Sequence, residues 1–101
     1  DAEIERFLKG IRPKKLTPKT KIEFRELLAE ILRARRQGYA ISDEELEIGL
    51  RSIAVPVTDS RGQTALAMAV SLQAARMTPG RMIERLLPAL QSGKQALSAM
   101  L

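Results

Sequence analysis

Two apolar segments joined by a short polar link constrain the fold of this 101-residue chain more than any other feature. Residues 50–57 (LRSIAVPV) and 64–72 (TALAMAVSL) are rich in apolar residues typical of strands. The link between them, TDSRGQ, contains Asp59, Ser60 and Gly62, which favour turns. A short link joins antiparallel strands, because a parallel pair needs a long crossover connection. The sequence therefore predicts a β-hairpin.

The two faces of the predicted hairpin differ in side-chain size, because successive side chains of a strand point to opposite faces. One face is bulky and apolar, with Ile53, Val55, Val57, Leu66, Met68, Val70 and Leu72. The other face begins at Leu50 and carries small residues, Ser52, Ala54, Ala65, Ala67, Ala69 and Ser71. Arg51 falls on the bulky face, where we expect a structural role, either in an ion pair or with its stem over apolar surface.

Two interpretations of the small-residue face stay open at this point. Small side chains leave room above the strands, and the hydroxyls of Ser52 and Ser71 would place polar groups in that room, as a small-ligand pocket requires. Alternatively, a second helix lies close over the alanines. In either case the bulky face should pack against helices.

Apolar periodicity predicts helices on either side of the hairpin. Residues 1–9 have apolar positions at helical spacing and form a short helix, and residues 12–20 form a connector that contains two prolines. A stronger helix is expected over 21–37, capped by Thr20 with Glu23 in capping-box spacing, and ended by Gly38.

The remaining segments complete an α+β domain. We predict a short strand at residues 39–41, and a loop or single helical turn at 42–49. Thr78 and Pro79 should begin a helix that continues to about Met100, and Pro88 should kink or split it. The expected fold is a two-layer α+β (α/β) arrangement in which helices pack on an antiparallel sheet.

The composition excludes several classes of function. The chain has no Cys and no His, which removes thiol nucleophiles, histidine bases, disulfides and zinc sites built from those ligands. The acidic stretch Asp43, Glu44, Glu45 and Glu47 lacks the spacing of a calcium loop and is expected to be solvated. We predict no catalytic residue, no metal and no cofactor, and hence no enzyme. No apolar run approaches the about 20 residues of a membrane helix, and a cytoplasmic protein is expected.

The formal net charge of +5 allows two interpretations. Basic residues could attract DNA or anionic ligands, or they could form a solvated surface. The charges are dispersed, at Lys9, Arg12, Lys14, Lys15, Lys19, Lys21, Arg33, Arg35 and Arg36, and the chain has only three aromatic residues, Phe7, Phe24 and Tyr39. Both facts favour the solvated surface over a stand-alone DNA-binding protein.

Several longer motifs resemble one family. The stretches QGYAISDEELEIGLRSIAVPVTDSRGQ, LAMAVSLQAARMT and ERLLPAL, with KKLTPKT upstream, resemble the C-terminal part of bacterial IclR-family transcription regulators. The variants LRSIAVPV and QAAR are most similar to the subgroup that controls aromatic-acid catabolism, including regulators of protocatechuate, β-ketoadipate and 4-hydroxybenzoate metabolism.

The resemblance implies a domain organisation. Residues 1–101 would be the C-terminal part of a GAF-like effector-binding domain. An N-terminal winged helix-turn-helix domain, absent from this chain, would contact DNA. Because the chain begins with Asp1, we expect it to be part of a longer protein.

The resemblance also implies a site. Family positions that contact the effector correspond to Ser42, Ser52, Ala69 and Ser71, and the small-residue face adds Ala54 and Ala67. Family members that bind small 2-oxo acids carry Asp, Cys and Ser where this chain has Ser42, Ser52 and Ala69. The loss of polarity favours a flatter, more apolar carboxylic acid, such as a hydroxybenzoate.

The expected function follows from this site. A small carboxylic acid would bind the small-residue face and alter DNA binding through a homo-oligomer, a dimer or a tetramer. The alternative is an oligomerisation module with a vestigial pocket. We also expect the sheet of this chain to leave a strand edge unpaired, which favours contact with another chain or with the rest of the domain.

Overall fold

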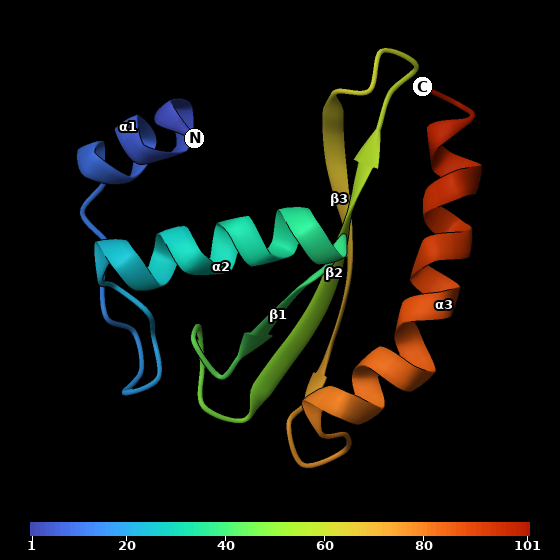
Figure 1. The fold of residues 1–101 in the computed structure, drawn as a ribbon. Helices are drawn as coiled ribbons and strands as arrows, with labels where there is room; N and C mark the ends of the chain where they lie inside the picture. The colour runs from blue at the N-terminus through green and yellow to red at the C-terminus, as the bar shows by residue number, and fades with distance from the viewer.

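The computed structural model describes residues 1–101 as an α+β domain of three helices and three strands. Figure 1 shows the sheet between α3 on one side and the pair α1 and α2 on the other. In chain order the elements are α1 (Ala2–Gly10), α2 (Phe24–Gln37), β1 (Ala40–Asp43), β2 (Leu50–Thr58), β3 (Thr64–Gln73) and α3 (Pro79–Ser98).

The sheet is antiparallel, in the order β1-β2-β3, and confirms the predicted hairpin. Val55 pairs with Met68, and Ala54 pairs with Ala69. Because directly opposite residues share a face, this register confirms the predicted separation of bulky and small side chains. The outer edges of β1 and β3 have no partner strand, as expected.

The core lies between the bulky face and α3. Ile53, Val55 and Val57 alternate with more exposed neighbours and are at most 1% exposed, and Met82 of α3 is fully buried against this face. α3 comes close to β3 at Gly93, where a Cβ atom would lie 2.7 Å from the Cε atom of Met68. Burial of these side chains supplies most of the apolar stabilisation of the domain.

Helix α3 begins as the sequence predicts. The Thr78 hydroxyl accepts a hydrogen bond from the Arg81 backbone N–H at 3.2 Å, and Pro79 occupies the first turn. The helix is continuous through Pro88, so it is not split. Figure 1 shows that its first turns run in a different direction from the rest, which is the expected kink.

The helix pair α1 and α2 is less buried. Leu8 of α1 is buried, but no residue of α2 is, and Phe7 is 63% exposed. Gly38 ends α2 with a φ of 84° and donates its N–H to Ala34 O, as the sequence predicts for a left-handed cap.

The predicted cap of α2 at Thr20 is wrong. The helix begins at Phe24 after Glu23, whose side chain makes no capping hydrogen bond. The Thr20 hydroxyl accepts from the backbone N–H groups of Leu16 and Thr17 and donates to the Glu45 carbonyl. A contact with a residue 25 positions away thus takes the hydroxyl that the capping box would use.

Strand β1 also differs from the prediction. It begins at Ala40 and continues through Ser42 and Asp43, which were expected in the following loop. The loop proper therefore begins at Glu44, whose φ of 60° turns the chain out of the strand. This extension aligns Ser42 with Ser52 of β2.

Candidate functional site

Three serines form a row across the small-residue face. Ser42 pairs with Ser52, and Ser52 pairs with Ser71, so one hydroxyl comes from each strand. The hydroxyl oxygens of Ser52 and Ser71 are hydrogen-bonded at 2.7 Å. We call these residues the serine row. Their hydroxyls can donate to and accept from a polar ligand group.

Alanines continue this face beyond the serine row. Ala40, Ala54 and Ala69 form the next row, and Pro56 pairs with Ala67 in the row after that. The face therefore changes from polar to apolar along the strands. A flat apolar ring could lie over the alanines while a polar substituent contacts the serines.

No helix of this chain covers the serine row. The face lies opposite to the core and to α3, and Ala67, Ala69 and Ser71 are exposed. Only the C-terminal part of α2 borders the small-residue face, at its apolar end. Of the two interpretations of this face, the close-lying helix is therefore limited to the alanine end that α2 borders, and the serine row is left open.

A cavity of about 510 Å³ lies where α2 borders the sheet. Ala40, Ala54, Pro56 and Ala67 of the sheet contribute to its lining, together with Ile31, Ala34, Arg35, Gly38, Tyr39, Val55, Thr64 and Lys94. Of the six predicted site residues, Ala54 and Ala67 line the cavity, whereas Ser42, Ser52, Ala69 and Ser71 lie outside it. The cavity has the size and mainly apolar lining typical of small-ligand sites.

The residues that α2 and α3 contribute to this cavity are not among the predicted site residues. Arg35 was expected to be one of the dispersed basic residues of a solvated surface, and no role was predicted for Lys94. Tyr39 was assigned to a strand, although it precedes β1. No local signal in the sequence brings these positions together, because they come from different elements.

Arg51 has the structural role that its position predicts. Its Nε donates to Asp43 Oδ1 at 2.8 Å, and its Nη1 donates to the carbonyls of Ala74, at 2.8 Å, and Met77. The side chain is 12% exposed. Arg51 thus ties β1 and the segment before α3 to the bulky side of β2.

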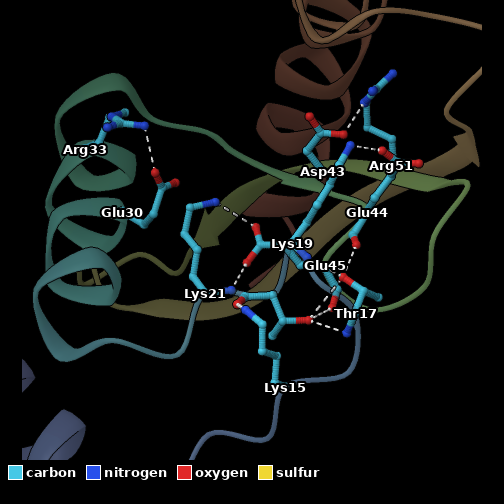
Figure 2. A network of polar contacts seen from close by, with 11 residues as sticks. Lys15, Thr17, Lys19, Lys21, Glu30, Arg33, Asp43, Glu44, Glu45 and Arg51 are labelled. Carbon is cyan, nitrogen blue, oxygen red and sulfur yellow. Dashed lines mark hydrogen bonds and ion pairs between the residues drawn. The ribbon is translucent and has the colours of Figure 1, made fainter.

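The basic connector is attached to the acidic loop, which corrects the expectation that both are simply solvated. Figure 2 shows the contacts. Lys19 forms an ion pair with Glu44, and Lys21 Nζ lies 3.1 Å from Glu45 Oε2. The buried Thr17 hydroxyl donates to the Glu44 carbonyl at 2.7 Å. We call this group the clamp: Thr17, Lys19, Thr20, Lys21, Glu44 and Glu45.

The ion pair between Lys19 and Glu44, at the centre of the clamp, shifts the pKa values of both side chains. A hydrogen bond from Lys19, and a second from the Gly49 backbone N–H, lower the pKa of the Glu44 carboxyl below its usual value of 4.5. The same hydrogen bond and the charge of Glu44 raise the pKa of Lys19 above 10.5. Both groups are therefore charged at neutral pH. Glu44 and Glu45 of the clamp follow Ser42 by two and three positions, so the clamp anchors the chain next to one end of the serine row.

The side chains at this site offer non-covalent contacts to a ligand. Hydroxyls, apolar side chains and the basic side chains of Arg35 and Lys94 can hold a ligand. No imidazole or thiol is present to act as base or nucleophile. The chain has no group of three or more acidic residues placed to hold a metal ion. None of its helices is long and apolar enough to cross a membrane.

Known proteins match almost the whole length of the chain. The family described as "Bacterial transcriptional regulator IclR C-terminal" matches residues 1–99. The Pca regulon regulatory protein of Pseudomonas putida is 37% identical over 97 residues, which cover 96% of this chain and 33% of that protein. The p-hydroxybenzoate hydroxylase transcriptional activator of Acinetobacter baylyi is 37% identical over 79 residues, 78% of this chain and 29% of that protein.

Solved structures are similar over the full chain. The inducer-binding domain of the PobR transcription factor from Acinetobacter, a double mutant in complex with 3-hydroxybenzoic acid, has a TM-score of 0.92 and 30% identity, covering 100% of this chain and 58% of that one. The C-terminal domain of Escherichia coli KdgR has a TM-score of 0.86 and 33% identity, covering 97% of this chain and 59% of that one.

The chain spans about a third of the length of the curated relatives it matches. These relatives are transcriptional regulators and not enzymes. The fold, the motifs and the match over residues 1–99 lead to one conclusion: the chain belongs to the IclR family of bacterial transcriptional regulators and corresponds to its C-terminal regulatory domain.

Proposed function

We propose that this chain senses an aromatic carboxylic acid for a transcriptional regulator. The acid lies on the small-residue face, with its ring over the alanines and a polar substituent at the serine row. The binding energy differs between two arrangements of a homo-oligomer, a dimer or a tetramer, and this difference changes how DNA-binding domains elsewhere in the regulator are placed. DNA contact belongs to those domains, and the site of action is the cytoplasm, where bacterial DNA lies.

One observation carries the proposal. The serine row and the alanine rows form an amphipathic surface, whose polar end no helix of this chain covers and whose apolar end lines a mainly apolar cavity. Such a surface matches a ligand with an apolar ring and polar ends. The similarity to an inducer-binding domain in complex with 3-hydroxybenzoic acid supports this ligand class. The Asp43–Arg51 ion pair and the clamp hold the strands that present Ser42 and Ser52.

The test is calorimetric titration of the chain with 3-hydroxybenzoate. Ser71→Val removes a hydroxyl of the serine row while keeping a side chain suited to a strand, and it should weaken binding by about 0.5–1.5 kcal/mol, the contribution of a typical hydrogen bond. Ser60→Val in the hairpin turn is the matched control and should bind as the unmodified chain does. Equal affinity of the Ser71→Val variant and the unmodified chain would remove the serine row from the site.

A second function, oligomerisation with a vestigial pocket, is favoured by a different observation. Helix α2 has no buried residue, although Leu27, Leu28, Ile31 and Leu32 give it an apolar face, and the edge of β3 is free. A second copy of the chain could cover both surfaces. Light scattering that gives a dimer or larger assembly, together with no calorimetric signal for aromatic acids, would favour this function over sensing.

A further inference from the structure

The cavity beside α2 has an unbalanced charge. Its lining includes two basic residues, Arg35 and Lys94, and no acidic residue. Arg35 forms an ion pair with Asp1, the N-cap residue of α1, because its Nη1 donates a hydrogen bond to Asp1 Oδ2 at 3.3 Å. Lys94 is half-buried and takes part in none of the seven ion pairs of the chain. A partly desolvated ammonium group without a carboxylate is stabilised when an anion binds beside it.

Lys94 reaches this cavity because strand β1 is short. The pairing of β1 with β2 stops at Ala40 and Ala54, so β2 has no partner on that side from Val55 onward. Helix α3 passes close to the sheet at Gly93, and the next residue, Lys94, lines the cavity together with Val55 and Pro56. A residue of the core-side helix thereby faces the same cavity as the alanines of the opposite face.

The cavity and the serine row lie at opposite ends of one apolar floor. Residues on one face of a strand are about 7 Å apart, so the Ala54 row separates the serine row from the row of Pro56 and Ala67 by one step on each side. A benzene ring over Ala54 would direct one substituent toward the serines and the other toward the cavity that Lys94 and Arg35 line.

We propose that Lys94, together with Arg35 of the same cavity lining, binds the carboxylate of the aromatic acid and thereby sets its orientation, leaving the hydroxyl of the acid for the serine row. This inference rests on the proposed function but assigns the charge recognition to residues outside the small-residue face. It makes the site selective for aromatic anions over neutral aromatic compounds of the same shape.

The experiment compares benzoate with benzamide, which have the same ring and differ in charge. Calorimetry on the unmodified chain should show benzoate bound at least about tenfold more tightly, the ratio expected when a hydrogen bond between two charged groups replaces a neutral one. Lys94→Gln should remove most of this preference, and Lys94→Arg should keep it. Arg35→Gln should have a smaller effect, because Asp1 already neutralises Arg35 in part.

Lys9→Gln is the matched control, since it makes the same change in charge on an exposed helix position outside the cavity. Circular dichroism of each variant establishes that the fold is kept. A benzoate preference that survives Lys94→Gln, or its absence in the unmodified chain, would overturn the inference.

The serine variant separates this inference from the proposed function. Benzoate has no hydroxyl, so Ser71→Val should leave its preference over benzamide unchanged while weakening 3-hydroxybenzoate. Loss of the preference in Lys94→Gln, with 3-hydroxybenzoate unaffected by Ser71→Val, would support the cation site and refute the serine row. Weaker binding of 3-hydroxybenzoate by Ser71→Val, with the benzoate preference unchanged in Lys94→Gln, would support the serine row and refute the cation site.

Discussion

The two halves of this domain are held together by different kinds of contact. In the C-terminal half, α3 packs on β2 and β3 through fully buried apolar side chains such as Ile53 and Met82. In the N-terminal half, α1 and α2 share one buried side chain, Leu8, and the segment between them is attached to the loop after β1 through the clamp. The comparison indicates that the sheet and α3 form the stable unit, whereas polar contacts position α1 and α2.

The largest expected effect is in the apolar half. Met82→Ala removes a fully buried side chain at the centre of the contact between α3 and the sheet, and it should lower the free energy of unfolding by about 2–5 kcal/mol. Urea denaturation followed by circular dichroism measures the change. Met100→Ala, at a position that is 80% exposed, is the control and should have little effect.

The next effect is expected in the clamp. Thr17 is 8% exposed, and Thr17→Val removes the hydroxyl that donates to the Glu44 carbonyl. The substitution should lower the free energy of unfolding by about 1–3 kcal/mol, because the carbonyl loses its hydrogen-bond donor. Thr17→Ser should recover most of the loss. Thr64→Val, at an exposed residue with no side-chain hydrogen bond, is the control. Destabilisation as large as that of Met82→Ala would contradict the division into a stable unit and an attached one.

A smaller effect is expected on α2. Leu28 lies in a helix without a buried residue, so Leu28→Ala removes little buried apolar surface. It should lower the free energy of unfolding of the monomeric chain by about 1 kcal/mol or less. Denaturation at several protein concentrations checks this. A cost that rises with concentration would mean that a second copy buries the α2 face, which favours the oligomerisation function.

The smallest effect concerns pH. Since the pKa of Glu44 is lowered in the folded chain, its charge contributes stability above about pH 4.5 that is lost as the pH falls through the lowered value. The raised pKa of Lys19 contributes stability below pH 10.5 that is lost as the pH rises through the raised value. Glu44→Gln should flatten the acid side of the stability profile, whereas Glu26→Gln, at an exposed residue without an ion pair, should not.

Alternation along the strands, with the cap signal at Thr78, was sufficient to predict the main features of the stable unit. The bulky and small faces, the hairpin, the start of α3 at Thr78 and the structural role of Arg51 follow from local patterns and are confirmed. The polar attachment could not be predicted this way. Thr20 has the local signature of a helix cap, and only the folded chain places its hydroxyl beside the Glu45 carbonyl.

The site shows the same division between local and long-range information. Alternation placed Ser52, Ala54, Ala67, Ala69 and Ser71 on one face, and the resemblance to the family added Ser42, which β1 aligns with them. That these residues bind an effector stays a prediction. Lys94 could not be found from the sequence, because its place at the cavity depends on where β1 ends and on how closely α3 approaches the sheet.

The clamp has a consequence for how freely related sequences can diverge. The hydroxyls of Thr17 and Thr20 donate to main-chain carbonyls of the loop, which every amino acid provides. Positions 44 and 45 can therefore carry other side chains in related proteins and still accept these two hydrogen bonds. Replacement of either threonine by a residue without a hydroxyl removes the hydrogen bond that this threonine donates. Diversity is accordingly expected to accumulate on the acidic side of the contact, next to the strand that carries Ser42, where new ligand preferences could arise without loss of the fold.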